Sequence, residues 1–166
     1  KRDQPILVIL GCTASGKSDL AMNLADRLDA EIVSCDSMMV YRRMDIGTAK
    51  PTQADRAAIP HHLLDVAEPS ESFSLGRYVA LADNTIADIR ARGRLPIVVG
   101  GTALYIKGLL EGLFEGPGAD PEFRAAIRAR AVDQGAATLH AELAAVDPDA
   151  ARRIHLNDLR RIERAL

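Results

Sequence analysis

The stretch GCTASGKS (residues 11–18) fits the pattern G-x-x-x-x-G-K-[ST]. A continuous apolar run at 5–10 precedes it, and residues 18–28 follow with Leu20, Leu24 and Leu28 at helical spacing. A strand, a glycine-rich loop and a helix in this order bind phosphate, because loop and helix N–H groups surround the anionic oxygens. The predicted phosphate-binding residues are Gly11, Thr13, Ala14, Ser15, Gly16, Lys17 and Ser18, with Ser18 also a candidate Mg²⁺ ligand.

The runs at 31–35 and 95–99 are typical of strands buried on both faces of a parallel sheet, and 62–66 is a weaker candidate. Ser74 is a candidate N-cap for a helix through Arg92, and Thr102 begins another helix. Strands that alternate with helices predict an α/β fold, a P-loop NTPase-like parallel sheet flanked by helices.

The sequence changes character after residues 115–121. From Pro121 onward we find only a helical pattern rich in Ala and Arg, with breaks at Gly135, at Asp147-Pro148 and around Asn157. We therefore predict an α/β core over residues 1–116 and a helical insertion subdomain over residues 117–166. Three strong strands and one weak one make a thin sheet, so we expect the chain to be a fragment of a longer protein.

The composition is that of a globular protein: 166 residues, 48% hydrophobic and 27% charged. A net charge of −2 excludes a polycation, so nucleic acid could bind only through a local arginine patch. Cys12 and Cys35 lack a CxxC partner, which favours free thiols in the cytoplasm. No apolar run approaches the roughly 18 residues of a membrane helix. We expect a cytoplasmic monomer that does not bind membranes.

Asp36 is the candidate acidic residue near the phosphates. The strand at 95–99 ends in Gly100-Gly101-Thr102 without a carboxylate, whereas the strand at 31–35 ends directly before Asp36. Carboxyl ends of parallel strands face the ligand crevice of such sheets, so we expect Asp36 to point toward the bound ligand.

Several motifs together resemble one family, the tRNA dimethylallyltransferases, also called IPP transferases. They are the P-loop, DSMMVYRRMDIGTAKP (36–51), PHHLLDV (60–66), VGGTALYIKGLLEGL (99–113) and RIHLNDLRRIERAL (153–166). The resemblance covers essentially the whole chain in order. It implies that the P-loop holds the diphosphate of dimethylallyl diphosphate, with Mg²⁺ at Ser18, and that the N6 amine of an adenosine next to the anticodon displaces diphosphate.

The resemblance also implies residue roles. Lys17, Asp36 and Thr102 would be catalytic, with Asp36 as the base. The tRNA anticodon stem-loop would be the partner of the 117–166 subdomain and of the loop after Asp36. Met39 stands where the common family pattern has glutamine, so a side chain that could hydrogen-bond to the edge of the base is replaced by an apolar one. The implied tRNA contacts are Asp36, Ser37, Met38, Met39, Thr102, Arg124, Asn157, Asp158, Leu159, Arg160 and Arg161.

Other interpretations remain open. A related enzyme could prenylate free adenine nucleotides, a small-molecule kinase could hold ATP in the same loop, and a P-loop switch module would need no catalysis. Asp36 could brace its loop, and Thr102 could be only a helix N-cap. The arginines near the C-terminus could form a solvated face with salt bridges to Glu163 and Asp158, although Arg153, Arg160 and Arg164 could share a helical face.

Overall fold

The computed structural model describes residues 5–113 and 120–166. The chain divides into two compact units, Lys1–Phe114 and Glu115–Leu166. The predicted boundary between residues 116 and 117 lies outside the described residues. Within the described ranges, no helix is both long and apolar enough to cross a membrane.

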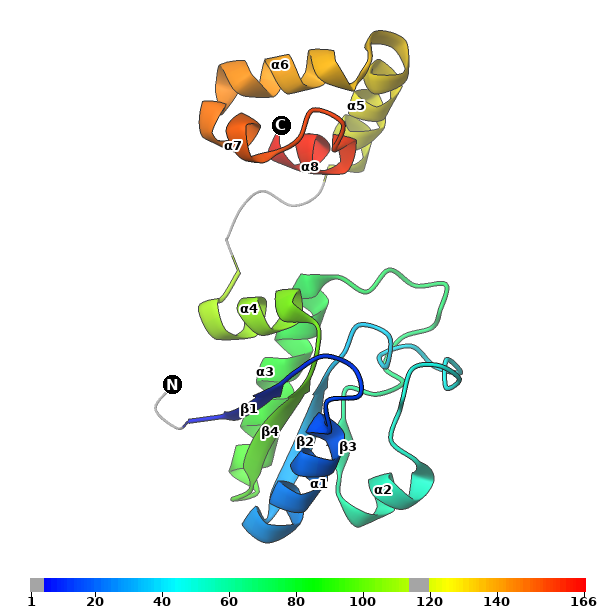
Figure 1. Cartoon of the computed structure of the whole chain (residues 1–166), viewed down its shortest axis with the longest axis vertical. Helices are drawn as coiled ribbons and strands as arrows, with labels where there is room; N and C mark the ends of the chain where they lie inside the picture. The colour runs from blue at the N-terminus through cyan, green and yellow to red at the C-terminus, as the bar shows by residue number, and fades with distance from the viewer. Residues whose placement is uncertain (1–4, 114–119) are drawn as a thin grey trace. The chain divides into compact units, whose positions relative to one another are not determined.

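The first unit contains a parallel four-stranded sheet in the order β1-β4-β2-β3 (Figure 1). This confirms the predicted α/β fold class. The strands are β1 (Leu7–Leu10), β2 (Ala30–Cys35), β3 (His61–His62) and β4 (Leu95–Gly100).

The weak strand predicted at 62–66 is shorter than expected. β3 covers only His61–His62, because Leu63 and Asp65 adopt left-handed φ angles of 60° and 57° that end the extended backbone. These two residues instead turn the chain back toward the loop that follows β2.

Helices cover both faces of the sheet (Figure 1). The α1 helix (Lys17–Leu28) packs on the face that presents Ile32 and Ile97, whereas α3 (Leu75–Ala91) and α4 (Ala103–Glu111) pack on the opposite face. Consecutive strand residues point to opposite faces, and both faces are covered, which is why all of β2 and all of β4 except its first residue are buried.

The helix predicted after the P-loop is α1, but the leucines whose spacing predicted it do not form its most buried face. Ala21 and Ala25 are buried, whereas Leu20 and Leu28 are about half exposed, and Leu24 is only partly buried. Small side chains allow the helix to lie close to the sheet, and α1 starts directly at the P-loop with no linker to move it outward.

Tyr78 joins α3 to the sheet. Its ring is buried and stacks on Tyr105 of α4 at a centroid distance of 4.1 Å, and its hydroxyl donates to Ser34 O at 3.2 Å. Ser74 caps α3 as predicted, because its Oγ accepts a hydrogen bond from the Arg77 N–H.

The loop after β2 contains a helix that sequence analysis missed. The α2 helix (Gln53–Ala58) begins with a capping box, in which Thr52 Oγ1 accepts from the Asp55 N–H and Asp55 Oδ2 accepts from the Thr52 N–H. The T-x-x-D spacing was the signal that could have revealed it.

The second unit is entirely helical over its described residues, and its breaks match those predicted. Its core consists of Ile127, Leu139, Leu143, Ala150, Ala151 and Ile162. Its helices are α5 (Pro121–Gln134), α6 (Ala136–Val146), α7 (Pro148–Arg153) and α8 (Leu159–Ala165).

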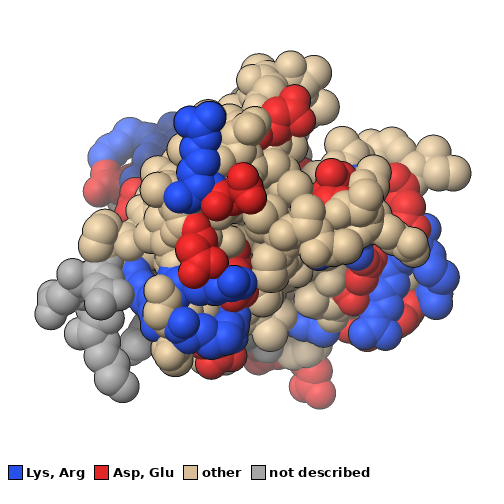
Figure 2. All heavy atoms as spheres, turned by 90° about the horizontal axis from the view of Figure 1, so that it is seen from below, with Lys and Arg blue, Asp and Glu red and all other residues tan. Residues whose placement is uncertain are grey.

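Charges of both signs are mixed on the surface. On the face shown in Figure 2, Lys and Arg side chains lie next to Asp and Glu side chains.

Glu31 of β2 is a buried carboxylate that is surrounded by basic side chains. Its carboxylate accepts hydrogen bonds from Arg92 Nη2 at 2.7 Å and from Arg94 Nη1 at 3.4 Å, and it lies 2.6 Å from His62 Nε2.

We predict that Glu31 makes stability depend on pH. Burial alone would raise the pKa of Glu31, but the hydrogen bonds from Arg92 and His62 outweigh burial, and the pKa lies below the ordinary 4.5. A depressed pKa contributes stability above the unfolded-state pKa and loses it as pH falls through the folded-state pKa. We expect Glu31→Gln to cost about 2 kcal/mol near pH 7, because a buried charged acceptor is lost.

Urea unfolding across pH checks this expectation. The difference between the wild type and Glu31→Gln should shrink as pH falls below about 4.5, because the unfolded-state carboxylate becomes protonated there and the native carboxylate only at lower pH. The exposed Glu111→Gln variant is the control, with little change at any pH. A pH-independent Glu31→Gln effect would contradict the electrostatic explanation.

A second prediction concerns Gly100, the last residue of β4. A Cβ at this position would lie 2.0 Å from Cys35 O, so no side chain fits without moving β2. We expect Gly100→Ala to destabilise the protein by about 3 kcal/mol or more, measured by urea unfolding. Gly76→Ala on α3 is the matched control, because a Cβ there meets nothing closer than 3.8 Å; equal effects of the two variants would refute the prediction.

Candidate functional site

The P-loop connects β1 to α1 in a conformation suited to anions. Ala14 and Gly16 have left-handed φ angles of 64° and 76°, and the Ser15 N–H donates to Cys12 O at 3.3 Å. Gly16 is the N-cap of α1 and makes no side-chain capping bond, so the first N–H groups of the helix open onto the loop. A Cβ at Gly11 would lie 2.6 Å from Ser15 Oγ, so a side chain there would require the Ser15 hydroxyl to rotate away.

Lys17, the first residue of α1, folds back onto this loop. Its Nζ donates to Cys12 O at 3.1 Å. A carbonyl is a weaker acceptor for an ammonium group than a phosphate oxygen, so a bound phosphate can compete for this bond. The positive charge therefore lies at the place where the motif requires it.

Asp36 follows the end of β2 and forms a tight turn. Its Oδ1 accepts hydrogen bonds from the Met38 N–H at 2.8 Å and the Met39 N–H at 3.3 Å. The interpretation of Asp36 as a loop brace is therefore correct for this oxygen. Its Oδ2 makes no hydrogen bond to another residue in the described part of the chain, so the carboxylate keeps an acceptor for other partners.

Thr102 joins the loop after β4 to the Asp36 turn. It is the N-cap residue of α4, but its side chain makes no capping bond. Its Oγ1 instead accepts from the Ser37 N–H at 3.0 Å, and its own N–H donates to Cys35 O at 3.2 Å. The interpretation of Thr102 as a simple cap is therefore wrong for its hydroxyl.

A cavity of about 170 Å³ brings several predicted residues together. Lys17 and Ser18 line it from α1, and Asp36 and Met39 line it from the loop after β2. Its apolar wall includes Met22, Ile32, Leu64 and Val99. Phosphate-binding groups, a carboxylate and an apolar wall thus share one cavity at the carboxyl ends of the strands. Thr102, Ser37 and Met38 are not among the lining residues and contact the site through the Asp36 turn.

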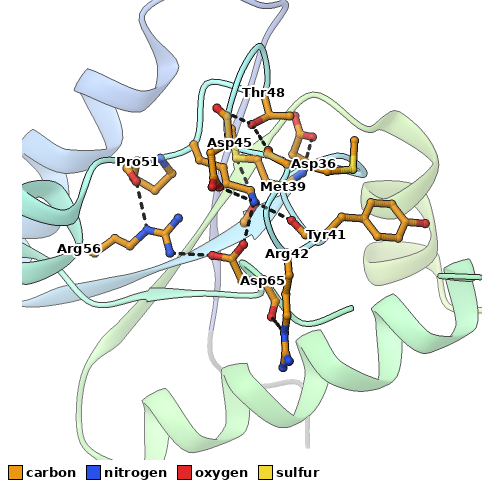
Figure 3. Close-up of polar contacts among 12 residues, drawn as sticks. Asp36, Met39, Tyr41, Arg42, Asp45, Thr48, Pro51, Arg56 and Asp65 are labelled. Atoms are coloured by element: carbon orange, nitrogen blue, oxygen red, sulfur yellow. Dashed lines mark hydrogen bonds and ion pairs between the residues drawn. The ribbon is translucent and has the colours of Figure 1, made fainter. Parts of the chain in front are cut away.

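Four charged or titratable residues of this cavity were not predicted: Asp19, Lys50, Asp55 and His61. The Nδ1 of His61 lies 2.7 Å from Ile59 O, and burial lowers the pKa of His61. Lys50 bonds to Tyr41 and Asp65, two residues distant in sequence that are labelled in Figure 3, so periodicity gave no signal for it. Its place within the DIGTAKP motif was the available signal.

The remaining predicted tRNA contacts lie in the second unit. Asn157, Arg160 and Arg161 are exposed, Leu159 is half-buried, and Asp158 caps α8 by accepting from the Arg161 N–H at 3.1 Å.

The predicted helical face of Arg153, Arg160 and Arg164 does not form, because Arg153 lies on α7 and the other two on α8. The expected salt bridges are also different. Glu163 pairs with Arg128 of α5 at 2.7 Å and lies 3.7 Å from Arg124.

The model of the IPP transferase family matches residues 39–166, and the model of the isopentenyl transferase family matches residues 4–65. The chain belongs to the IPP transferase family. Among curated relatives, the tRNA dimethylallyltransferase of Methylococcus capsulatus is 60% identical over 98% of this chain, and that of Anaeromyxobacter dehalogenans is 58% identical over 97%. The chain spans 52% and 54% of these two proteins, about half of their length.

Solved structures of the family have the same fold. The tRNA isopentenylpyrophosphate transferase of Bacillus halodurans is 45% identical, with a TM-score of 0.65 over 96% of this chain and 53% of that one. A eukaryotic dimethylallyltransferase acting on tRNA is 32% identical, with a TM-score of 0.83 over 96% of this chain and 40% of that one.

Lys17 provides a direct test of phosphate binding. We expect Lys17→Met to weaken binding of inorganic diphosphate about 10- to 100-fold, because one charge-assisted contact is lost. Isothermal titration calorimetry with Mg²⁺ present measures the effect. Lys107→Met, which removes an exposed lysine from α4, should leave the affinity unchanged. Equal affinities of Lys17→Met and wild type would contradict the assignment.

Proposed function

We propose that the protein transfers a dimethylallyl group from dimethylallyl diphosphate to N6 of an adenosine next to the anticodon of tRNA. The observation that carries this proposal is the shared cavity, which has Lys17 and Ser18 on one side and Asp36 on the other. Membership of the IPP transferase family and relatives named tRNA dimethylallyltransferase support it. The monomeric state and the cytoplasmic location stay predictions.

In the proposed reaction, the P-loop holds the leaving group. Residues 11–18 supply backbone N–H donors and Lys17 supplies a positive charge to the diphosphate oxygens. The bond between the allylic carbon and the bridging oxygen breaks, and these groups stabilise the negative charge that develops on diphosphate. Preorganised donors suit this task, because they need no rearrangement during the reaction.

Mg²⁺ is the proposed cofactor, with the Ser18 hydroxyl as its protein ligand. No group of three or more His, Cys, Asp or Glu side chains that could hold a metal occurs within residues 5–113 and 120–166. This donor set fits Mg²⁺ better than a metal that needs several protein ligands, because Mg²⁺ keeps much of its water and phosphate coordination. When bound, the ion would neutralise charge on the diphosphate.

Asp36 is the proposed base. The adenine N6 amine forms a bond to the allylic carbon as diphosphate leaves, and the proton lost from N6 passes to the Asp36 carboxylate. Oδ1 is occupied by the N–H groups of Met38 and Met39, so Oδ2 is the oxygen that receives the proton. The Thr102 hydroxyl accepts from the Ser37 N–H and retains its own proton, which it can donate to the bridging oxygen.

The acceptor nucleotide has to reach Asp36 outside its base stack, since a stacked adenine does not expose N6 to a cavity. Met39 lines the cavity and would contact the base through its thioether, without the polar contact of the common family pattern. The anticodon stem-loop is the proposed partner of Arg124 and of residues 157–161, whose exposed arginines suit phosphate contacts.

A transfer assay tests the proposal. The full-length protein is incubated with labelled dimethylallyl diphosphate, Mg²⁺ and unmodified tRNA, with AMP and ATP as competing acceptors. We expect label in tRNA, and a loss of kcat of about 10²- to 10⁴-fold in Asp36→Asn, because the amide is not a proton acceptor. The amide oxygen still accepts from Met38 and Met39, so Asp36→Asn keeps the turn, whereas Asp36→Ala loses both properties.

The rival functions give different outcomes. Label found only in AMP or ATP would favour an adenylate isopentenyltransferase. An absence of transfer together with tight ATP binding would favour a kinase or a switch module. Wild-type activity in Asp36→Asn would show that Asp36 is not the base, but it would not contradict the transfer reaction itself.

A further inference from the structure

Lys50 is a buried lysine beside the proposed acceptor site, and its partners Tyr41, Asp45 and Asp65 are labelled in Figure 3. Only 3% of its side chain is exposed. Its Nζ donates to Tyr41 O at 2.6 Å, to Asp65 Oδ1 at 2.7 Å and to Asp45 Oδ1 at 2.9 Å. An ammonium group has three N–H donors, so these three acceptors use all of them. Lys50 therefore has no donor left for a phosphate, although it lines the same cavity as Lys17.

Asp65 extends this network. Its Oδ2 accepts from Arg56 Nη1 at 2.8 Å, and its backbone carbonyl accepts from Arg42 Nε at 2.8 Å. Burial would lower the pKa of Lys50, but the hydrogen bonds to Asp65 and Asp45 outweigh burial and raise it. Burial would likewise raise the pKa of Asp65, but the hydrogen bonds from Lys50 and Arg56 lower it. The lysine and the carboxylate are therefore both charged at neutral pH.

The network holds the segment that follows Asp36. Tyr41 O, the acceptor for Lys50, lies two residues after Met39. The same segment is joined to residues 65–67 by backbone bonds, in which the Asp65 N–H donates to Met39 O at 3.2 Å and the Val66 N–H donates to Val40 O at 2.8 Å. Lys50 thus adds a charged contact, shielded from water, to the hydrogen bonds that Asp36, Thr102 and the backbone of residues 65–67 make with this segment.

We propose that Lys50 is a positioning residue for the acceptor nucleotide, which holds residues 36–41 so that Asp36 and Met39 face the cavity. This inference rests on the proposed function. Lys50 acts through Tyr41 and Asp65 and does not touch the diphosphate. Loss of Lys50 should therefore affect use of tRNA while leaving diphosphate binding by residues 11–18 unchanged.

Steady-state kinetics and calorimetry on the full-length protein separate these effects. We expect Lys50→Met to lower kcat/KM for tRNA about 100-fold, chiefly through a higher KM, because a small misplacement of the acceptor has a cost of this size. Its affinity for inorganic diphosphate with Mg²⁺ should stay within about twofold of wild type, since the P-loop is unchanged. Lys107→Met is the matched control, with wild-type values for both quantities.

Asp45→Asn is a milder second variant, since Asp45 is exposed and supplies only one of the three acceptors. It should raise KM for tRNA about threefold to tenfold without loss of folding. A fall in diphosphate affinity that matches the loss of kcat/KM, or a wild-type kcat/KM in Lys50→Met, would overturn the inference.

Hydrogen exchange distinguishes failure of this inference from failure of the proposed function. In Lys50→Met we expect faster exchange of the amides of residues 38–41 and 65–67, with exchange in residues 11–18 unchanged. If the wild type transfers nothing to tRNA, the proposed function fails whatever the exchange data show. If the wild type is active but Lys50→Met does not alter exchange in residues 38–41, the positioning role is refuted.

Discussion

The close approach of β2 and β4 at their carboxyl ends is the constraint on which the site depends. Gly100 pairs with Cys35 in the sheet and leaves no room for a Cβ against Cys35 O. The same carbonyl accepts from the Thr102 N–H, and Thr102 Oγ1 accepts from the Ser37 N–H. The loops after the two strands are therefore held together by one glycine and one threonine. β1 pairs with the other edge of β4, with Leu10 opposite Gly100, which places the start of the P-loop at the same level of the sheet.

Sequence patterns predicted those structural features that depend on residues close together in the chain. The P-loop, the ends of β2 and β4 and the position of Asp36 follow from consecutive residues, and the structure agrees with them to within one residue, whereas β3 is shorter than predicted. The leucine spacing predicted a helix at α1 but not its buried face, because close packing on the sheet favours Ala21 and Ala25 over larger leucines. Lys50 was missed for a different reason. Its partners come from three places in the chain, and only the folded backbone brings Tyr41 O, Asp45 and Asp65 around one Nζ.

In the second unit, one buried carboxylate is paired with an arginine from another helix. Glu163 of α8 is buried and forms two hydrogen bonds with Arg128 of α5, at 2.7 and 3.0 Å. Its charge is therefore satisfied mainly from another helix, while Arg160 and Arg161 of its own helix are exposed. A protein with a net charge of −2 can in this way present a basic helix surface without a basic composition. Along α8, buried and exposed positions alternate, so Glu163 faces the core while Arg160 and Arg161 face the solvent. The amino-acid composition does not reveal this arrangement.

The Cys12 carbonyl, which accepts a hydrogen bond from Lys17 Nζ, competes with a bound phosphate for the Lys17 ammonium group. A bound diphosphate gains only the difference between its own contact with the ammonium and the contact that the carbonyl already supplies. When diphosphate dissociates, the Lys17 ammonium group can form its hydrogen bond to Cys12 O again and is not left unpaired. In the proposed reaction, whose product is a highly charged anion, this exchange reduces the net affinity of the P-loop for diphosphate and so favours product release.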